Sequence, residues 1–177
     1  RVLVVAQEGQ DLGDLDVAVL ADSRPEQGPL VGLATGLAAS EAPWCFVVGC
    51  DMPFLRADII DRMARGLDDS DILAPHLDGD IQTLHAFYSR ACLPRATEVV
   101  DAGRRSLRAL FDRCNVRALD ATKLRDLDPG LLSLRDLDNV QDYQVAMQLT
   151  QQIPPGGSLV TPPVIAIVGP SDSGKTR

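Results

Sequence analysis

The chain has 177 residues, of which 45% are hydrophobic and 24% are charged, as expected for one globular domain with an ordinary core. A formal net charge of -8 and a sequence pI near 4.6 exclude a broad basic face for nucleic acid. No apolar run reaches the roughly 18 residues of a membrane-spanning helix, and no signal peptide is visible. We therefore expect a cytoplasmic protein without a membrane partner, and the four scattered cysteines predict reduced thiols rather than zinc ligands.

Apolar runs and helical periodicity alternate along the chain. Short apolar runs predict strands at 2–6, 17–20, 44–50, 71–75, 82–88, 116–119 and 131–134. Apolar residues repeating every three to four positions predict helices at 58–67, 91–100, 106–114 and 141–152, and a further helix follows the turn Gly28–Gly32 through about Ser40. This alternation predicts an α/β fold, a three-layer sandwich with a mainly parallel sheet.

The stretch Trp44–Leu55 is the most informative part of the sequence. Its apolar run predicts a strand buried on both faces, and Asp51 follows directly at the carboxyl end, before Pro53. Open α/β sheets bind ligands at that edge. A carboxylate held there suits a divalent cation on phosphate oxygens, although Asp51 could instead cap the helix beginning near Asp58.

Three further features could contact an anionic ligand. Asp22 follows the second predicted strand, where it could also be an ordinary solvated loop residue. The turn Gly28–Gly32 precedes a helix, and its glycines would allow the backbone to approach a ligand closely. Arg104 and Arg105 follow a predicted helix end at Gly103, and they either reach a phosphate or form a solvated face.

The C-terminal part of the sequence changes character. Residues 153–163 contain four prolines and two glycines, which predicts a linker. A new strand at 164–168 then leads into a complete G-x-x-x-x-G-K-[ST] pattern, with the fixed positions Gly169, Gly174, Lys175 and Thr176. Because the helix that should follow is absent, we expect these residues to be the disordered start of a second domain.

Together these motifs resemble the molybdenum cofactor guanylyltransferase family, the MobA-like nucleotidyltransferases. The resemblance spans about residues 1–148 and rests on four segments: Gly28–Gly32, Cys50–Pro53, Ala102–Leu107 and Asp136–Tyr143. It implies a Rossmann-like nucleotidyltransferase fold. The tail resembles the start of the family's partner, a MobB-like P-loop GTP-binding protein, so we expect domains at 1–148 and 164–177 joined by a linker at 149–163.

The resemblance implies transfer of GMP from GTP to molybdopterin, with Mg²⁺ (or Mn²⁺) as cofactor and molybdoenzymes as possible clients. Asp51 would be the catalytic residue and would hold the metal, with Asp138 as the second candidate ligand. The implied nucleotide-binding residues are Asp22, Gly28, Pro29, Leu30, Gly32 and Asp51. Arg104 and Arg105 would contact the substrate phosphate.

Members of this family begin with a strand and a glycine-rich loop that holds the triphosphate, and neither precedes Arg1 here. We therefore expect an N-terminally truncated sequence that is inactive by itself. Two alternatives remain open: a related cytidylyl- or sugar-phosphate nucleotidyltransferase, and a non-catalytic P-loop GTP-binding adapter.

Overall fold

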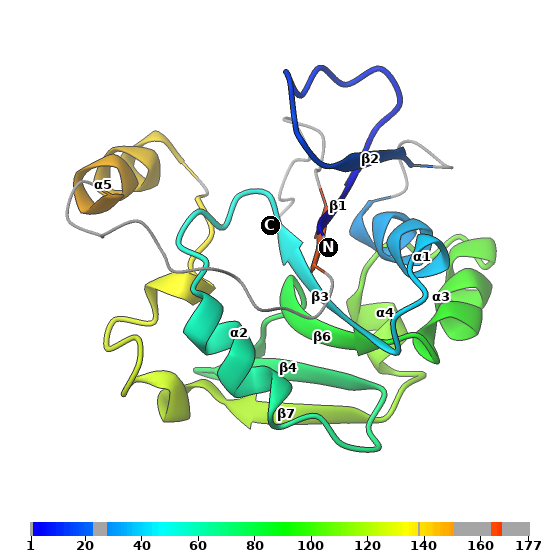
Figure 1. Ribbon diagram of the computed structural model, residues 1–177. Helices are drawn as coiled ribbons and strands as arrows, with labels where there is room; N and C mark the ends of the chain where they lie inside the picture. The colour runs from blue at the N-terminus through cyan, green and yellow to red at the C-terminus, as the bar shows by residue number, and fades with distance from the viewer. Residues whose placement is uncertain (1, 23–27, 138, 151–163, 168–177) are drawn as a thin grey trace.

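The computed structural model describes residues 2–22, 28–137, 139–150 and 164–167 as one sheet with helices on both faces (Figure 1). The eight-stranded sheet has the order β2-β1-β8-β3-β6-β4-β5, and β7 pairs with β4. Its strands are β1 Val2–Ala6, β2 Ala18–Ala21, β3 Trp44–Gly49, β4 Ile72–Leu77, β5 Asp80–Ile81, β6 His85–Ser89, β7 Val116–Asp120 and β8 Val164–Ile167. Every antiparallel pair among the described strands includes β5 or β6, and the other strand pairs are parallel. The predicted mainly parallel sheet is therefore confirmed.

Two apolar cores fill the spaces between the sheet and its helices. The first lies under α1 (Pro29–Ala39), α3 (Cys92–Asp101) and α4 (Arg108–Phe111). The second lies under α2 (Ala57–Ala64) and the 3-10 turns η1 (Ala121–Leu124) and η2 (Leu132–Leu134). Val47 points into the first core and Phe46 into the second, because successive side chains of a strand face opposite sides. The expected three-layer sandwich is therefore confirmed.

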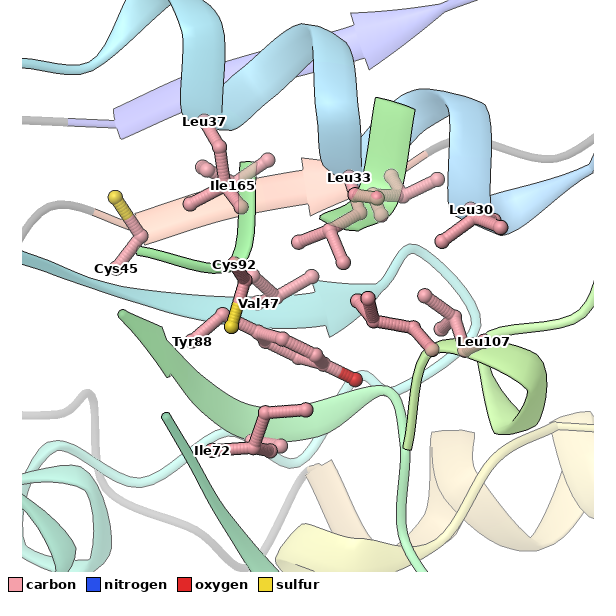
Figure 2. Close-up of a cluster of buried hydrophobic side chains, with 14 of the residues drawn as sticks. Leu30, Leu33, Leu37, Cys45, Val47, Ile72, Tyr88, Cys92, Leu107 and Ile165 are labelled. Carbon is pink, nitrogen blue, oxygen red and sulfur yellow. The ribbon is translucent and has the colours of Figure 1, made fainter. Parts of the chain in front are cut away.

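The strand β8 lies inside the main sheet, between β1 and β3 and parallel to both. Gly36 and Gly32 of α1 leave room for it, since a Cβ built on them would lie 2.6 Å from Ile165 Cγ2 and 2.9 Å from Ile167 Cγ2, respectively. Figure 2 shows Ile165 beneath α1, near Leu33 and Leu37. Our expectation of disorder is thus wrong for Val164–Ile167, because an apolar strand buries far more surface in this position than it would alone. The linker and residues 168–177 lie outside the described residues.

Two other local predictions also need correction. Residues 131–134 do not form a strand: Leu131 has a left-handed φ of 50° and the chain continues into η2. The predicted helix 106–114 shortens to α4. In contrast, α3 ends at Asp101, one residue beyond the predicted end, and Gly103 terminates it as predicted: Gly103 has a φ of 75° and its N–H donates to Val100 O at 2.8 Å. The last described helix is α5, Val140–Thr150. None of the described helices has the length and apolar composition needed to cross a membrane.

His85 at the start of β6 is completely buried, and neither ring nitrogen has a hydrogen-bond partner among the described residues. Its ring packs edge-on against Phe46, with centroids 4.9 Å apart. Burial lowers the pKa of His85 from 6.5 to about 4, although the nearby Asp128 charge acts in the opposite direction.

We predict that His85 makes the protein less stable in acid. Between pH 6.5 and about 4 the unfolded chain binds a proton that the folded chain excludes, so the free energy of unfolding falls as pH falls, by about 3 kcal/mol in total. Urea denaturation at several pH values should show this loss in the parent chain and not in His85→Leu. His76→Leu, which changes the half-buried second histidine, should keep it. An unchanged acid loss in His85→Leu would contradict the prediction.

Candidate nucleotidyltransferase site

Four neighbouring parallel strands end at the same edge of the sheet. Because β2, β1, β8 and β3 run in one direction, their last residues, Ala21, Ala6, Ile167 and Gly49, lie at that edge. The backbone continues the pairing on both sides: Cys50 N donates to Ile167 O at 3.2 Å, and Asp22 N donates to Ala6 O at 2.7 Å. Asp51 and Asp22 therefore share the edge where open α/β sheets bind ligands.

Asp51 is half-buried, and no described group forms a hydrogen bond or an ion pair with its carboxylate. It does not cap α2. That helix starts at Ala57, and the carboxylate near its first turn belongs to Asp58, which accepts from Ile59 N at 2.9 Å and pairs with Arg56 at 2.6 Å. The Arg56 hydrogen bond also lowers the pKa of Asp58. The capping alternative for Asp51 is thus wrong, and none of the described residues occupies its carboxylate oxygens.

Gly49 allows the Asp51 side chain to fold back over the end of β3. A Cβ at position 49 would lie 2.5 Å from Asp51 Oδ1, a distance that real Cβ atoms do not show. Sequence reasoning missed this residue. The available signal was a glycine two positions before a strand-end aspartate, where a small residue permits close approach.

The segment after η2 is tied directly to Asp51, because Leu137 N donates to Asp51 O at 2.8 Å. This bond places Leu137 beside the end of β3, although 86 positions separate Leu137 from Asp51 in the sequence. Asp136 is exposed, whereas Asp138, the predicted second metal ligand, lies outside the described residues. The role predicted for Asp138 stays a prediction, and the bond shows only that the preceding residue, Leu137, contacts the Asp51 backbone.

The N-terminus of α1 meets the loop after α3. Gly28 has a φ of 82°, and a Cβ on it would lie 3.4 Å from Arg105 O, so the two segments are in contact. Pro29 occupies the first turn of α1, and no side chain caps this end of the helix. Arg104 and Arg105 are exposed. Backbone N–H groups of an uncapped helix start and two guanidinium groups are suited to an anion.

Two of the predicted nucleotide-binding residues also pack the core. Leu30 is 0% exposed, and the missing side chain of Gly32 makes room for Ile167 of β8. A nucleotide contact by either residue stays a prediction, and it would have to come from the backbone. Asp22 is half-buried and three strands away from β3, about 14 Å at normal strand spacing, so one ligand touching both Asp22 and Asp51 must be extended.

The donor chemistry at this edge suits a hard divalent cation. Asp51 offers carboxylate oxygens, the ligands that Mg²⁺ and Mn²⁺ prefer. Among the described residues no three His, Cys, Asp or Glu side chains form a metal cluster, so any site requires further oxygens from the nucleotide, water or Asp138. This is typical of magnesium sites, which rely on one or two carboxylates and substrate phosphates.

Two small cavities of the described chain lie elsewhere. One, of about 200 Å³, lies between α3 and α4 and includes Arg104 in its wall. The other, of about 180 Å³, lies between α2 and β7 near Arg117. Neither is lined by Asp51. We place the candidate site at the open sheet edge because the polar groups, the helix start and the strand ends converge there.

Comparisons with known proteins agree with this architecture. A molybdenum cofactor guanylyltransferase from Desulfosudis oleivorans is 27% identical over 146 residues, covering 82% of this chain and 72% of that protein. One from Vibrio parahaemolyticus is 32% identical over 123 residues, covering 68% of this chain and 63% of that protein. The crystal structure of molybdopterin-guanine dinucleotide biosynthesis protein A from Archaeoglobus fulgidus has the same fold, with a TM-score of 0.69, 21% identity and coverage of 78% of this chain and 71% of that one.

The match spans between 46% and 72% of the length of the curated relatives. The sequence profile described as a MobA-like NTP transferase domain matches residues 1–119, which is most of the described sheet and its helices. The chain belongs to the MobA-like NTP transferase domain family.

Proposed function

We propose that the protein transfers GMP from GTP to molybdopterin; its relatives from Desulfosudis oleivorans and Vibrio parahaemolyticus bear the name molybdenum cofactor guanylyltransferase. A phosphate oxygen of molybdopterin attacks the α-phosphorus of GTP, and the bond to the β-phosphate breaks. The products are molybdopterin guanine dinucleotide and pyrophosphate. Because the attacking group is already an anion, the reaction needs charge neutralisation and alignment more than a strong base or a covalent nucleophile.

The observation that carries this proposal is the environment of Asp51. Its carboxylate has no described partner, Gly49 leaves room for it, and Leu137 ties the segment preceding Asp138 to its backbone. A cation held by Asp51, with Asp138 as candidate second ligand, would neutralise phosphate charge and favour departure of pyrophosphate. The chain's own groups orient the nucleotide: the uncapped start of α1 at Gly28 and Pro29 faces anionic groups, and Asp22 lies at the far end of an extended ligand.

Arg104 and Arg105 are proposed to contact the phosphate of molybdopterin. Their loop touches Gly28, and two guanidinium groups beside a helix start would hold a phosphate by several charge-assisted hydrogen bonds. The P-loop residues Gly169, Gly174, Lys175 and Thr176 lie outside the described residues. A GTP-binding role for them, within a fused MobB-like domain, remains a prediction from the sequence pattern.

The experiment uses the gene product that carries this sequence, supplied with molybdopterin, Mg²⁺ and either GTP or CTP, each labelled on the α-phosphate. We expect label to enter the dinucleotide product from GTP only, with one pyrophosphate released per transfer. Product formed only from CTP would assign the protein to the related cytidylyltransferases. GTP binding with no transfer from either nucleotide would favour the non-catalytic adapter.

A further inference from the structure

A pair of thiols, Cys92 and Cys114, lies outside the residues assigned to nucleotide transfer. Cys92 is the first residue of α3 and is completely buried, whereas Cys114, in the turn between α4 and β7, is half-buried. Their Sγ atoms are 3.9 Å apart. The two sulfurs are thus in direct contact although 22 positions separate them in the sequence.

The surrounding polar groups hold both sulfurs in place. Cys92 Sγ donates to the backbone oxygen of Asp71 at 3.3 Å. The Asp71 carboxylate accepts from the backbone N–H of Asn115 at 2.9 Å, which fixes the residue after Cys114. The same carboxylate pairs with Arg95 at 3.1 Å, one turn after Cys92 on α3. One aspartate therefore anchors both segments that carry the thiols.

The two thiols differ in reactivity. The hydrogen bond with Cys92 and, less strongly, the Arg95 guanidinium lower the pKa of Cys114, whereas the Cys114 contact and burial raise the pKa of Cys92. The partly exposed Cys114 is therefore the one that forms a thiolate and is reached from solvent. Cys92 is shielded and has Cys114 as its nearest sulfur.

We propose that Cys92 and Cys114 form a reversible disulfide when the protein meets a hydroperoxide. The Cys114 thiolate attacks the peroxide, the O–O bond breaks, and Cys114 becomes a sulfenic acid while hydroxide leaves and takes up a proton. The Cys92 sulfur then attacks the sulfenic sulfur, forms the S–S bond and releases the second water. The two thiols lose two electrons and two protons in total, hydrogen peroxide is reduced to two waters, and a dithiol reductant reverses the change.

Formation of the bond requires only a small local movement. The sulfurs must approach from 3.9 Å to about 2.05 Å. Cys92 is held within α3 under the first core, so the movement falls on the side chain of the half-buried Cys114. The bridge would join the start of α3 to the start of β7 without involving Asp51, Gly28 or Arg104.

The test treats the fully reduced protein with a small excess of hydrogen peroxide, then counts thiols after denaturation and maps peptides by mass spectrometry. Of the four thiols, we expect two to be lost together, with a Cys92–Cys114 linked peptide that dithiothreitol removes. Cys50→Ser is the matched control, since it removes the exposed cysteine and should leave the linked peptide unchanged. Cys92→Ser should instead give a sulfenic acid at Cys114 that reacts with dimedone, whereas Cys114→Ser should give none at Cys92.

Circular dichroism melting of each reduced variant checks that it is folded. The proposal is overturned if folded protein loses thiols without the Cys92–Cys114 peptide, if Cys50 is the only residue oxidised, or if the two serine variants are labelled equally.

Discussion

Asp51→Asn is expected to lower the rate of guanylyl transfer by roughly 10²- to 10⁴-fold. The amide keeps the size of the side chain but removes the charge that would hold a cation against the triphosphate, and such charge neutralisation contributes several kcal/mol to a transition state. The measurement is release of labelled pyrophosphate from GTP by the gene product that carries this sequence, at saturating Mg²⁺. The unfolding midpoint should change little, because no described group is bonded to the Asp51 carboxylate.

The matched control for this prediction is Asp58→Asn. It removes an exposed carboxylate seven residues later, one that is bonded to Arg56 and to the first turn of α2. We expect this variant to transfer GMP at nearly the parent rate and to lose some stability. Equal transfer rates for Asp51→Asn and the parent protein would show that the Asp51 carboxylate has no part in the reaction.

Ile165→Asp is expected to have the largest effect on stability, a loss of at least about 4 kcal/mol. Ile165 is 0% exposed and lies against Gly36 of α1, so the substitution places a carboxylate without a partner in the first core. The loss has a structural consequence as well. Among the described strands β1 pairs only with β2 and β8, so removing β8 separates β1 and β2 from β3 and the rest of the sheet.

Urea denaturation followed by circular dichroism measures this effect, and limited proteolysis reports whether residues near β8 become accessible. Gln148→Asp is the control, because it adds the same charge at an exposed position of α5 and should change the free energy of unfolding by no more than about 0.5 kcal/mol. If Ile165→Asp were as stable as the control, β8 would not belong to this sheet and residues 164–177 would be better described as the start of a separate domain.

The functional edge was largely predictable from local sequence. A run of apolar residues ending in Gly49 and followed by Asp51 specifies both a buried strand and the position of a carboxylate at its end, because strand burial and chain direction are encoded in neighbouring residues. The glycine-proline start of α1 was predictable for the same reason. The burial of Leu30 and the contact of Gly32 with β8 were not predictable, since a helix face that packs on a strand and one that meets a ligand can have the same short sequence.

The position of β8 required long-range information. The run Val164–Ile167 predicts a strand equally well in a second domain or in this sheet. Its residues alone do not specify which strands it pairs with. The slot between β1 and β3 and the two glycines of α1 are formed by segments more than 100 residues earlier.

By itself, the sequence determined the α/β class, most of the strands and helices, and the carboxylate at the end of β3, because periodicity and residue type act over a few neighbouring positions. Only the tertiary structure decided which strand lies beside β3, that Asp51 is not a helix cap, and that Cys92 and Cys114 touch. Those features depend on contacts between segments far apart in the chain, whose geometry arises when the two cores pack against the sheet.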